Sequence, residues 1–374
     1  MIFKLPLSFI YQCMSANKTD NPFSFIRPSK IILPVIIGLG VVFYLFIREY
    51  KPGSFSSLHF TYKAVFFLLL AFLFMACRDI GYMIRIRILT DYELTWRKAF
   101  RVIMLWEFTS AITPSAVGGT SVAILFVTKE GVSIGKSSAA VMTTSFLDEL
   151  YFIAVFPLLL LFINAKALFI IGGVSAQSTS YMNEFFYFAL IGYFLKFVYI
   201  IILSYGLFIN PRGLKWILLN IFKWPFLKKW RQGANKAGTE IIQSSMEMKS
   251  KPISFWIKTF SATFLSWSSR YLVVNALFMA FFIVSDHTLL FARQFVMQNM
   301  LLVSPTPGGS GFAEFIFSRY LRDFLPNGLI HIESLVVALA FFWRLISYYP
   351  YLIMGSIIIP SWIKRKFHKT NIKS

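Results

Sequence analysis

The chain reads Thr113-Pro114-Ser115-Ala116-Val117-Gly118-Gly119-Thr120 at one point and Ser304-Pro305-Thr306-Pro307-Gly308-Gly309-Ser310-Gly311 at another. Each stretch has a hydroxyl residue, a Pro, a short step, Gly-Gly and another hydroxyl residue, and each interrupts an apolar run. Pro removes a backbone donor and Gly loosens a helix. Inside a membrane, non-helical backbone survives only where it is buried in protein or lines a cavity. These stretches, the first break (113–120) and the second break (304–311), are therefore predicted to be hairpin tips in a bundle interior. Turns outside the membrane are the alternative, and the match between the two breaks disfavours it.

The composition predicts a membrane protein. Of 374 residues, 57% are hydrophobic and 14% are charged, whereas soluble domains carry about 25% charged residues. The mean hydropathy is +0.66. Lys and Arg outnumber Asp and Glu by 37 to 16. The basic residues lie between long apolar runs, which is the positive-inside pattern rather than a nucleic-acid site. The predicted fold class is an all-α polytopic membrane protein.

Several apolar runs approach the length of about 20 residues that a membrane-spanning helix needs. Two shorter segments, each built around one break, are predicted to be re-entrant: 100–128 from the cytoplasmic side and 289–325 from the outside. The six full spans are predicted at residues 31–47, 63–77 (extending past Arg78 and Asp79), 138–163, 184–209, 253–284 and 333–359.

Loop charge sets the predicted orientation, with the basic segments on the cytoplasmic side. Residues 210–251 carry nine Lys and Arg against two Glu, and the segment from Arg85 to Arg101 is also strongly basic. Both termini are therefore expected in the cytoplasm. The predicted organisation is an N-terminal cytoplasmic arm (1–30), a first membrane half (31–209), a basic interfacial loop (210–251), a second membrane half (252–360) and a basic cytoplasmic tail (361–374).

The two halves are predicted to form an inverted repeat, because each break lies between one span before it and one span after it. Interrupted short segments at matching places in two halves are the best sequence sign of a transporter site. Glu107 and Gln298 stand seven residues before the first Pro of their breaks. Helices starting after Gly119 and Gly311 are expected to aim free N–H groups at the breaks, where anionic groups such as phosphate bind.

Ionisable residues within membrane spans are costly and mark functional sites. Asp148 and Arg344 are predicted either to pair with each other or to hold a charged headgroup, and Lys196 is expected to snorkel. Arg78 and Asp79 are interpreted as interfacial, without a role. Structural ion pairing is the alternative for all of these charges. The candidate substrate-binding residues are Glu107, Pro114, Gly118, Gly119, Asp148, Glu149, Arg270, Pro305, Gly308, Gly309, Glu314 and Arg344.

The sequence offers no catalytic constellation outside the membrane. It contains no HExxH, CxxC, Walker or GxSxG motif, so we expect no enzyme, no cofactor and no metal. The loop 210–251 mixes basic residues with aromatic ones, which is typical of an amphipathic helix on an anionic lipid surface. No nucleic-acid partner is expected, since no recognition motif accompanies the basic residues.

Several motifs together resemble the lysylphosphatidylglycerol synthase transmembrane-region family, the flippase-like domain of the bacterial multiple peptide resistance factor and of its stand-alone relatives. They are TPSAVGGTSVAILFVTKEGVSIGKSSAAV (113–141), LDEL (147–150), SPTPGGSGFAE (304–314), WRLISYYP (343–350) and Gly355. The resemblance implies a lipid-translocating domain with two re-entrant segments in the bacterial plasma (inner) membrane. The best-known members flip aminoacylated phosphatidylglycerol. Many relatives carry an acidic residue and an Arg just after the first Gly-Gly, where this chain has Thr120 to Ala123.

The preferred hypothesis is therefore a flippase-like transporter of an anionic or aminoacylated phospholipid or of a lipid-linked intermediate. One alternative is a non-transporting membrane subunit that docks a separate glycosyl- or aminoacyl-transferase on loop 210–251. Another is an intramembrane lipid-modifying enzyme in which Glu107, Asp148 or Glu314 acts as acid or base. The sequence leaves open whether the protein forms a homo-oligomer.

Overall fold

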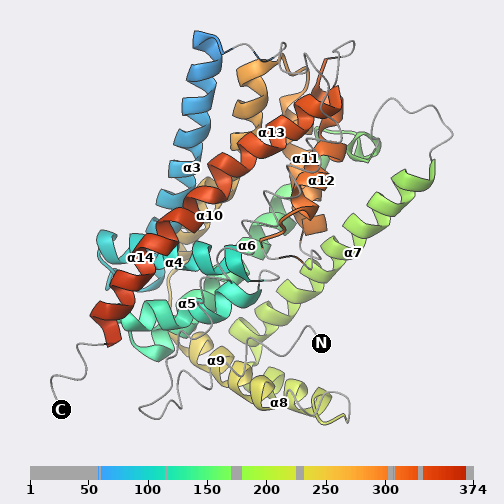
Figure 1. Ribbon diagram of the computed structural model, residues 1–374. Helices are drawn as coiled ribbons and strands as arrows, with labels where there is room; N and C mark the ends of the chain where they lie inside the picture. The colour runs from blue at the N-terminus through green and yellow to red at the C-terminus, as the bar shows by residue number, and fades with distance from the viewer. Residues whose placement is uncertain are drawn as a thin grey trace.

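The computed structural model (Figure 1) describes residues 58, 60–113, 117–169, 179–224, 231–301, 306, 308–326 and 332–367. These residues form helices joined by turns, with no strand among them, so the described chain is all-α as predicted. The arm 1–30, the predicted span 31–47, Pro114, Pro305 and residues 368–374 lie outside the described residues.

Four helical stretches of the described chain are long and apolar enough to cross a membrane, and each overlaps a predicted span. They are α3 (Tyr62–Leu89), α6 (Ile134–Leu160), Leu190–Ile209 and Ile332–Lys366. Leu190–Ile209 joins most of α7 (Thr179–Ser204) to the π-helical turn Tyr205–Ile209. α10 (Ile253–Phe281) forms one helix over the predicted span 253–284 but is not among the four. The number of six full spans therefore stays a prediction.

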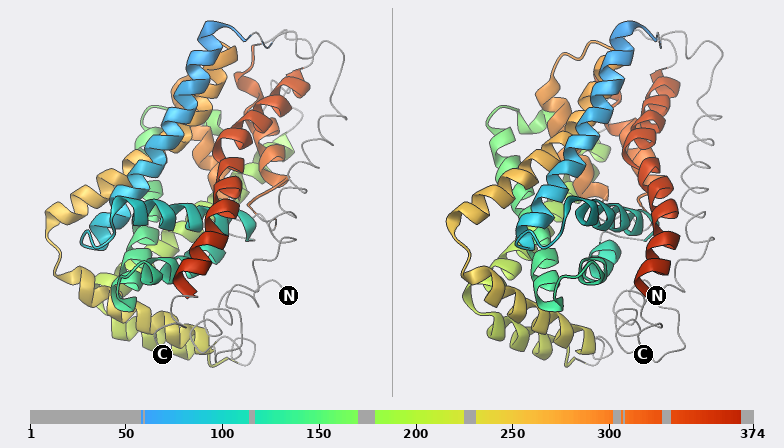
Figure 2. Two further views of the ribbon diagram at one scale, coloured as in Figure 1. Left: turned by 60° about the vertical axis from the view of Figure 1, so that its left-hand side comes forward. Right: turned by 90° about the vertical axis from the view of Figure 1, so that its left-hand side faces the viewer.

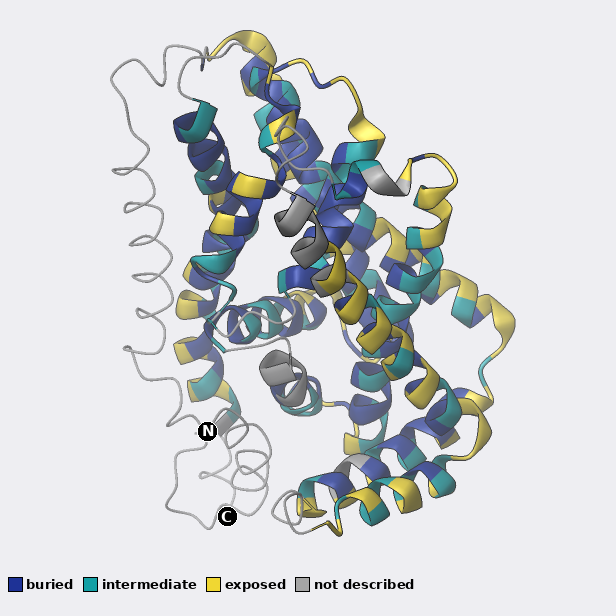
Figure 3. Ribbon diagram, turned by 90° about the vertical axis from the view of Figure 1, so that its right-hand side faces the viewer, coloured by how far each residue is buried: buried dark blue, intermediate teal, exposed yellow. Residues whose placement is uncertain are grey.

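The outer faces of the long helices are apolar, as contact with lipid requires. Figure 3 shows exposed residues running along the outside of the bundle. Contiguous exposed apolar surface of this extent marks a membrane or a protein interface rather than a water-exposed face. The exposed apolar residues of α7 are Phe186, Tyr187, Leu190, Ile191, Phe194, Leu195, Phe197, Tyr199, Ile201 and Ile202.

α3 and α10 form the most extensive helix contact of the described chain. Arg78, Tyr82 and Arg85 are buried and recur at helical spacing, so they share the face of α3 that meets α10. The prediction that Arg85 belongs to a basic loop is wrong, because α3 continues to Leu89 and leaves Arg85 only 4% exposed. The interpretation of Arg78 as interfacial is wrong as well, since Arg78 is 1% exposed.

Pairs of shorter helices flank the two breaks. α4 (Trp96–Ile112) contacts α5 (Val117–Lys129) around the first break, and α11 (His287–Leu301) contacts α12 (Phe312–Tyr320) around the second. The first pair lies in the lower half of the molecule and the second in the upper half (Figure 1). α4 and α5 run across the direction of α3 (Figure 2). Short 3₁₀ turns follow α6 (Ala165–Leu168) and α12 (Arg322–Phe324).

The basic loop 210–251 is a helical hairpin at the lower end of the molecule, made of α8 (Pro211–Ile221) and α9 (Arg231–Lys249). α8 starts at a cap in which Asn210 Oδ1 accepts the Gly213 N–H at 2.7 Å, and Pro211 occupies the first turn. α8 packs against α9. Trp216 and Trp224 stay exposed, and so do the aliphatic residues Ile217 and Ile221.

The predicted last span 333–359 consists of two helices, α13 (Ile332–Ser347) and α14 (Tyr349–Phe367), separated at Tyr348. Pro350 explains the division, since Pro lacks an N–H and fits the first turn of a new helix. α14 then crosses α4, and Gly355 of α14 lies flush against Phe108 of α4.

We expect Gly355→Ala to lower the free energy of unfolding by about 1–3 kcal/mol. The alanine Cβ would overlap the Cβ, Cγ and Cδ2 atoms of Phe108, which lie too close to the Phe108 backbone to move away freely. The matched control is Gly135→Ala in the first turn of α6, where a Cβ meets nothing within 4 Å. Thermal unfolding of both purified variants in one detergent makes the comparison. Equal stability of Gly355→Ala and wild type would contradict this packing.

A buried carboxylate connects the ends of α4, α5 and α14. The Glu130 side chain is 0% exposed and pairs with Arg101 at 2.9 Å and with Lys366 at 3.0 Å. Trp362 Nε1 donates to its Oε1 at 2.8 Å. Burial alone raises the pKa of Glu130, but the hydrogen bonds from Arg101, Lys366 and Trp362 outweigh burial, and its pKa lies below the ordinary value.

A folded-state pKa below the unfolded one makes the Glu130 carboxylate stabilising above the ordinary Glu pKa of about 4.3. That contribution is lost as the pH falls through the lowered pKa. We therefore expect Glu130→Gln to lower the melting temperature at pH 7 and to flatten its decline below about pH 4.3. Melting curves between neutral and acidic pH test this, and parallel curves for variant and wild type would rule it out.

Candidate functional site

A cavity of about 300 Å³ lies where α3, α4, α6, α10, α11, α13, α14 and the second break meet. Its charged lining residues are Arg78, Arg85, Glu107, Asp148, Arg270 and Arg344. Its aromatic lining residues are Tyr82, Trp106, Trp267, Trp343, Tyr348 and Tyr351. The structure thus brings Glu107, Asp148, Arg270, Gly308, Gly309 and Arg344, all predicted site residues, around one space.

The two breaks meet at the edge of this cavity. The Gly308 N–H donates to the Thr113 carbonyl at 3.5 Å, and the Tyr348 hydroxyl donates to the Ala111 carbonyl at 3.1 Å. The Tyr348 hydroxyl also lies 3.3 Å from Ser310 Oγ. Gly308 has φ +57°, and a Cβ there would lie 2.7 Å from the Ala111 oxygen. Only glycine fits this position, because both the left-handed backbone and the crowding exclude a side chain.

Arg344 and Glu314 hold the described end of the second break, Gly308 to Gly311, in shape. Arg344 Nε donates to Glu314 Oε1 at 2.9 Å, and its Nη atoms donate to the carbonyls of Gly308 and Gly309 at 3.2 Å each. Glu314 Oε2 accepts the Gly311 N–H at 2.7 Å. The sequence predicted free N–H groups at the start of this helix. The Gly311 N–H is not free for a ligand, because Glu314 of the same helix accepts its hydrogen bond.

The first break differs from its predicted form. α5 begins at Val117 rather than after Gly119, so Gly118 and Gly119 lie in its first turn. The first N–H groups of a helix have no intrahelical acceptor, so the N–H groups of both glycines have no acceptor within α5. Pro114 lies outside the described residues.

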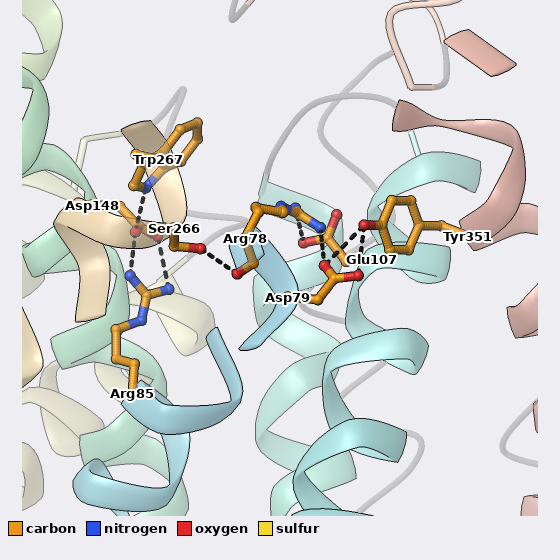
Figure 4. Close-up of polar contacts among 8 residues, drawn as sticks. All are labelled: Arg78, Asp79, Arg85, Glu107, Asp148, Ser266, Trp267 and Tyr351. Atoms are coloured by element: carbon orange, nitrogen blue, oxygen red, sulfur yellow. Dashed lines mark hydrogen bonds and ion pairs between the residues drawn. The ribbon is translucent and has the colours of Figure 1, made fainter. Parts of the chain in front are cut away.

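Arg78 is the centre of a charged cluster beside the cavity (Figure 4). Its guanidinium pairs with Glu107 at 2.6 Å and with Asp79 at 2.8 Å. The Tyr351 hydroxyl donates to both Asp79 oxygens, at 2.8 and 2.9 Å. The Ser266 hydroxyl donates to the Arg78 carbonyl at 2.7 Å. The cluster thus joins α3, α4, α10 and α14 around one buried cation.

Asp148 belongs to a second cluster on the same cavity (Figure 4). Its Oδ1 accepts from Arg85 Nη1 at 2.5 Å and from Trp267 Nε1 at 2.7 Å. Arg85 also donates to Thr263 Oγ1 at 3.1 Å. The predicted direct pair between Asp148 and Arg344 is therefore wrong. Each has a nearer partner of opposite charge, and both face the cavity instead.

Arg270 stands apart from these pairs. It projects from the middle of α10, lines the cavity and lies with its guanidinium carbon 5.5 Å from the centre of the Trp267 ring. Among the described residues it forms no ion pair, in contrast to Arg78, Arg85 and Arg344. A half-buried guanidinium without a carboxylate, facing a cavity between apolar helices, is a natural site for an anion.

Glu149 lies outside the cavity, on another face of α6. Its carboxylate pairs with Lys196 of α7, whose Nζ lies 3.0 and 2.8 Å from its two oxygens. Lys196 is 4% exposed and also lies 4.0 Å from the centre of the Phe152 ring. Lys196 therefore does not snorkel, because a partner within the bundle neutralises it.

Sequence reasoning missed Arg78, Arg85 and Tyr351. The spacing of Arg78, Tyr82 and Arg85 at i, i+4 and i+7 was the available signal, since it puts two cations and an aromatic ring on one helix face. Counting Arg85 as loop charge and interpreting Arg78 as interfacial concealed this signal. Among the described residues no group of His, Cys, Asp and Glu is arranged to hold a metal ion.

Comparison with known proteins fits this architecture. Residues 31–355 match the sequence profile described as the lysylphosphatidylglycerol synthase TM region. The chain belongs to this family. It is also 25% identical over 315 residues to a UPF0104 membrane protein of Archaeoglobus fulgidus, a match that covers 82% of this chain and 89% of that protein. The family and the apolar helices together make this chain a multi-pass membrane protein.

We expect Glu314→Gln and Arg344→Gln each to destabilise the protein by about 3–5 kcal/mol, since each leaves a buried charge without its partner. The double variant should lose less than the sum of the two. The partly exposed pair of Arg322 and Glu333 is the control, with an expected coupling of at most about 1 kcal/mol. For each pair, chemical unfolding in detergent measures the free energy of unfolding of the wild type, the two single variants and the double variant. If the effects of the two single substitutions in the buried pair simply add, the coupling between Glu314 and Arg344 is refuted.

Proposed function

We propose that this protein is a flippase-like transporter that passes the headgroup of a membrane lipid through the central cavity while the acyl chains stay in the bilayer. The observation that supports it most is the placement of a polar, arginine-rich cavity at the junction of two helix breaks, inside a bundle with an apolar outer surface. Such a cavity suits the part of a lipid that cannot enter hydrocarbon.

The proposed topology has six full spans and two re-entrant pairs, α4–α5 and α11–α12, in an inverted repeat. The placement of the two pairs in opposite halves of the molecule supports it (Figure 1). So does the contact between Gly308 and Thr113, which joins the two breaks. We place the α8–α9 end and both termini on the cytoplasmic side of the plasma membrane, because basic residues concentrate there.

The charges around the cavity favour an anionic headgroup. Glu107 and Asp148 are engaged by Arg78 and Arg85, and the Arg344 guanidinium is held by Glu314. An aminoacylated headgroup would need a carboxylate for its ammonium group, and each of these acids already has a cation. Arg270 offers a guanidinium with no such partner among the described residues. We therefore assign Arg270 as the contact for a lipid phosphate.

The engaged carboxylates also favour transport over catalysis, because a general acid or base needs a proton site open to the substrate. The sequence carries no nucleotide-binding motif, so we propose facilitated or ion-coupled movement.

The exposed Trp216, Ile217 and Ile221 of α8, next to basic residues, support a second role for the α8–α9 hairpin. We propose that this hairpin rests on the anionic lipid surface. A separate transferase that docks on the same face is the alternative, and it would make the chain a non-transporting subunit.

We expect Arg270→Gln to slow lipid exchange at least about tenfold, the effect of losing one hydrogen bond to a charged group. Lys258→Gln, an exposed cation on the same helix, is the control and is expected to keep the wild-type rate. Purified protein is reconstituted with labelled phosphatidylglycerol, its aminoacyl form or a polyprenyl phosphate, and a membrane-impermeant quencher reads exchange between leaflets.

If Arg270→Gln exchanges lipid at the wild-type rate, the assignment of Arg270 as the phosphate contact is wrong. Failure of the intact wild-type protein to exchange any of the three lipids would refute transport of these lipids and favour the subunit role. Pull-downs with and without the α8–α9 hairpin would then follow.

A further inference from the structure

A second pocket, of about 250 Å³, lies at the end of the molecule that carries α8 and α9, separate from the central cavity. It is lined by Arg101 at the start of α4 and by Trp362, Arg365 and Lys366 at the end of α14. None of these residues lines the central cavity. The pocket is therefore a distinct feature with three cations and an indole ring.

Glu130 fixes two of the three cations of this pocket, Arg101 and Lys366, in place. It accepts from Arg101 Nε at 3.2 Å and Nη2 at 2.9 Å, and Lys366 pairs with the same carboxylate at 3.0 Å. Trp362 Nε1 donates to it at 2.8 Å. The side chains of Arg101 and Lys366 are 25% and 27% exposed, whereas that of Glu130 is fully covered. A covered acid beneath two partly open bases leaves positive charge at the surface and holds it in a defined geometry.

Arg365 adds a cation that this acid does not neutralise. Its guanidinium bonds only within its own helix, from Nε to the Ser361 carbonyl at 3.2 Å and from Nη2 to Ser361 Oγ at 3.4 Å. It is exposed and pairs with no carboxylate of the described chain. With one acid for three cations, the pocket has a positive surplus suited to a phosphate group.

The position of the pocket identifies the source of that phosphate. α14 is the end of an apolar stretch long enough to span a membrane, and Ile353 and Ile357 are exposed on its earlier turns, at 60% and 69%. Basic side chains at the cytoplasmic end of such a helix lie at the level of the lipid headgroups, while the buried Trp362 forms a wall of the pocket. Basic pockets between helices at this level bind anionic headgroups. A lipid whose phosphate enters the pocket can lay its acyl chains along α14.

We propose that the pocket of Arg101, Trp362, Arg365 and Lys366 binds the phosphate of an anionic phospholipid that stays in place and is not transported. The bound lipid bridges α4 and α14. The same two helices contribute Glu107 and Tyr351 to the central cavity. The lipid therefore stabilises the relative position of two walls of the cavity. This inference does not depend on transport, and it holds equally for a non-transporting subunit.

The test uses Arg365→Gln, which leaves the Glu130 contacts intact, and Lys364→Gln as its control. Lys364 is an exposed cation next to Arg365 on the same helix but does not line the pocket. Purified full-length protein in a neutral detergent is titrated with phosphatidylglycerol, phosphatidylcholine or inorganic phosphate. A ligand that binds only the folded state raises the melting temperature, and at a fixed concentration the rise grows with the logarithm of its affinity. Native mass spectrometry counts the lipids retained.

We expect phosphatidylglycerol, but neither phosphatidylcholine nor inorganic phosphate, to stabilise the wild-type protein. Arg365→Gln should weaken the apparent affinity about fivefold, the effect of one basic residue near an anionic headgroup, and Lys364→Gln should not. The same response in an Arg270→Gln background would show that the lipid binds outside the central cavity.

Three results would overturn the proposal. Equal weakening by Arg365→Gln and Lys364→Gln would indicate a diffuse surface charge. Stabilisation by inorganic phosphate as strong as that by the lipid would indicate a soluble phosphate ligand. Loss of the whole lipid response in the Arg270→Gln background would assign the lipid to the central cavity.

Discussion

Irregular backbone in an apolar interior has carbonyl groups that lack both helical partners and water, so another donor must satisfy them. At the second break, the Arg344 guanidinium donates to the carbonyls of Gly308 and Gly309. Its own charge then needs an acid, which Glu314 supplies from the next helix while capping Gly311. Without this pair, the left-handed turn that contacts Thr113 would have no fixed position. The meeting of the two breaks, and with it the cavity, depends on this ion pair.

The same constraint explains the other charges of the bundle. A guanidinium at membrane depth costs several kcal/mol unless it is paired or faces a cavity. Arg78 and Arg85 satisfy the condition by pairing, and each pair ties α3 to another helix. Such pairs add little net stability compared with apolar packing, so their use here requires a further reason. For the proposed headgroup site, such pairs hold the charges of the walls in place, and among the described charged residues of the cavity lining Arg270 is the one without an ion pair.

The sequence predicted the helical membrane fold and the family from hydropathy and motifs, because both are local properties of the chain. It also singled out Glu107, Asp148, Arg270 and Arg344, which line one cavity, since polar residues in apolar runs are recognisable by composition alone. It did not predict their partners. A helical period fixes which residues share a face, as for Arg78 and Arg85 on α3, but not which helix that face meets. The pairing of Asp148 with Arg85 rather than Arg344 is such a tertiary choice.

Local errors have a similar origin. Gly-Gly in the first break was expected to precede its helix, yet it lies within the first turn of α5, where a glycine is tolerated because few hydrogen bonds depend on it. Pro350 was available as a sign that the last span divides, since Pro starts helices more readily than it continues them. The division places Tyr348 in a turn, and from there its hydroxyl reaches both Ser310 and the Ala111 carbonyl.

The contact between α4 and α14 connects the periphery of the molecule to its cavity. Along it lie the cluster around Glu130 at the end of α14, the flush packing of Gly355 on Phe108, and the cavity residues Glu107 and Tyr351. Tyr351 bonds Asp79, and Asp79 and Glu107 share Arg78. Because close-packed interiors have low compressibility and transmit strain, a change in the angle between α4 and α14 at the membrane surface would also be felt at Glu107 and Tyr351. A lipid bound at the proposed pocket would in this way act on the cavity without entering it.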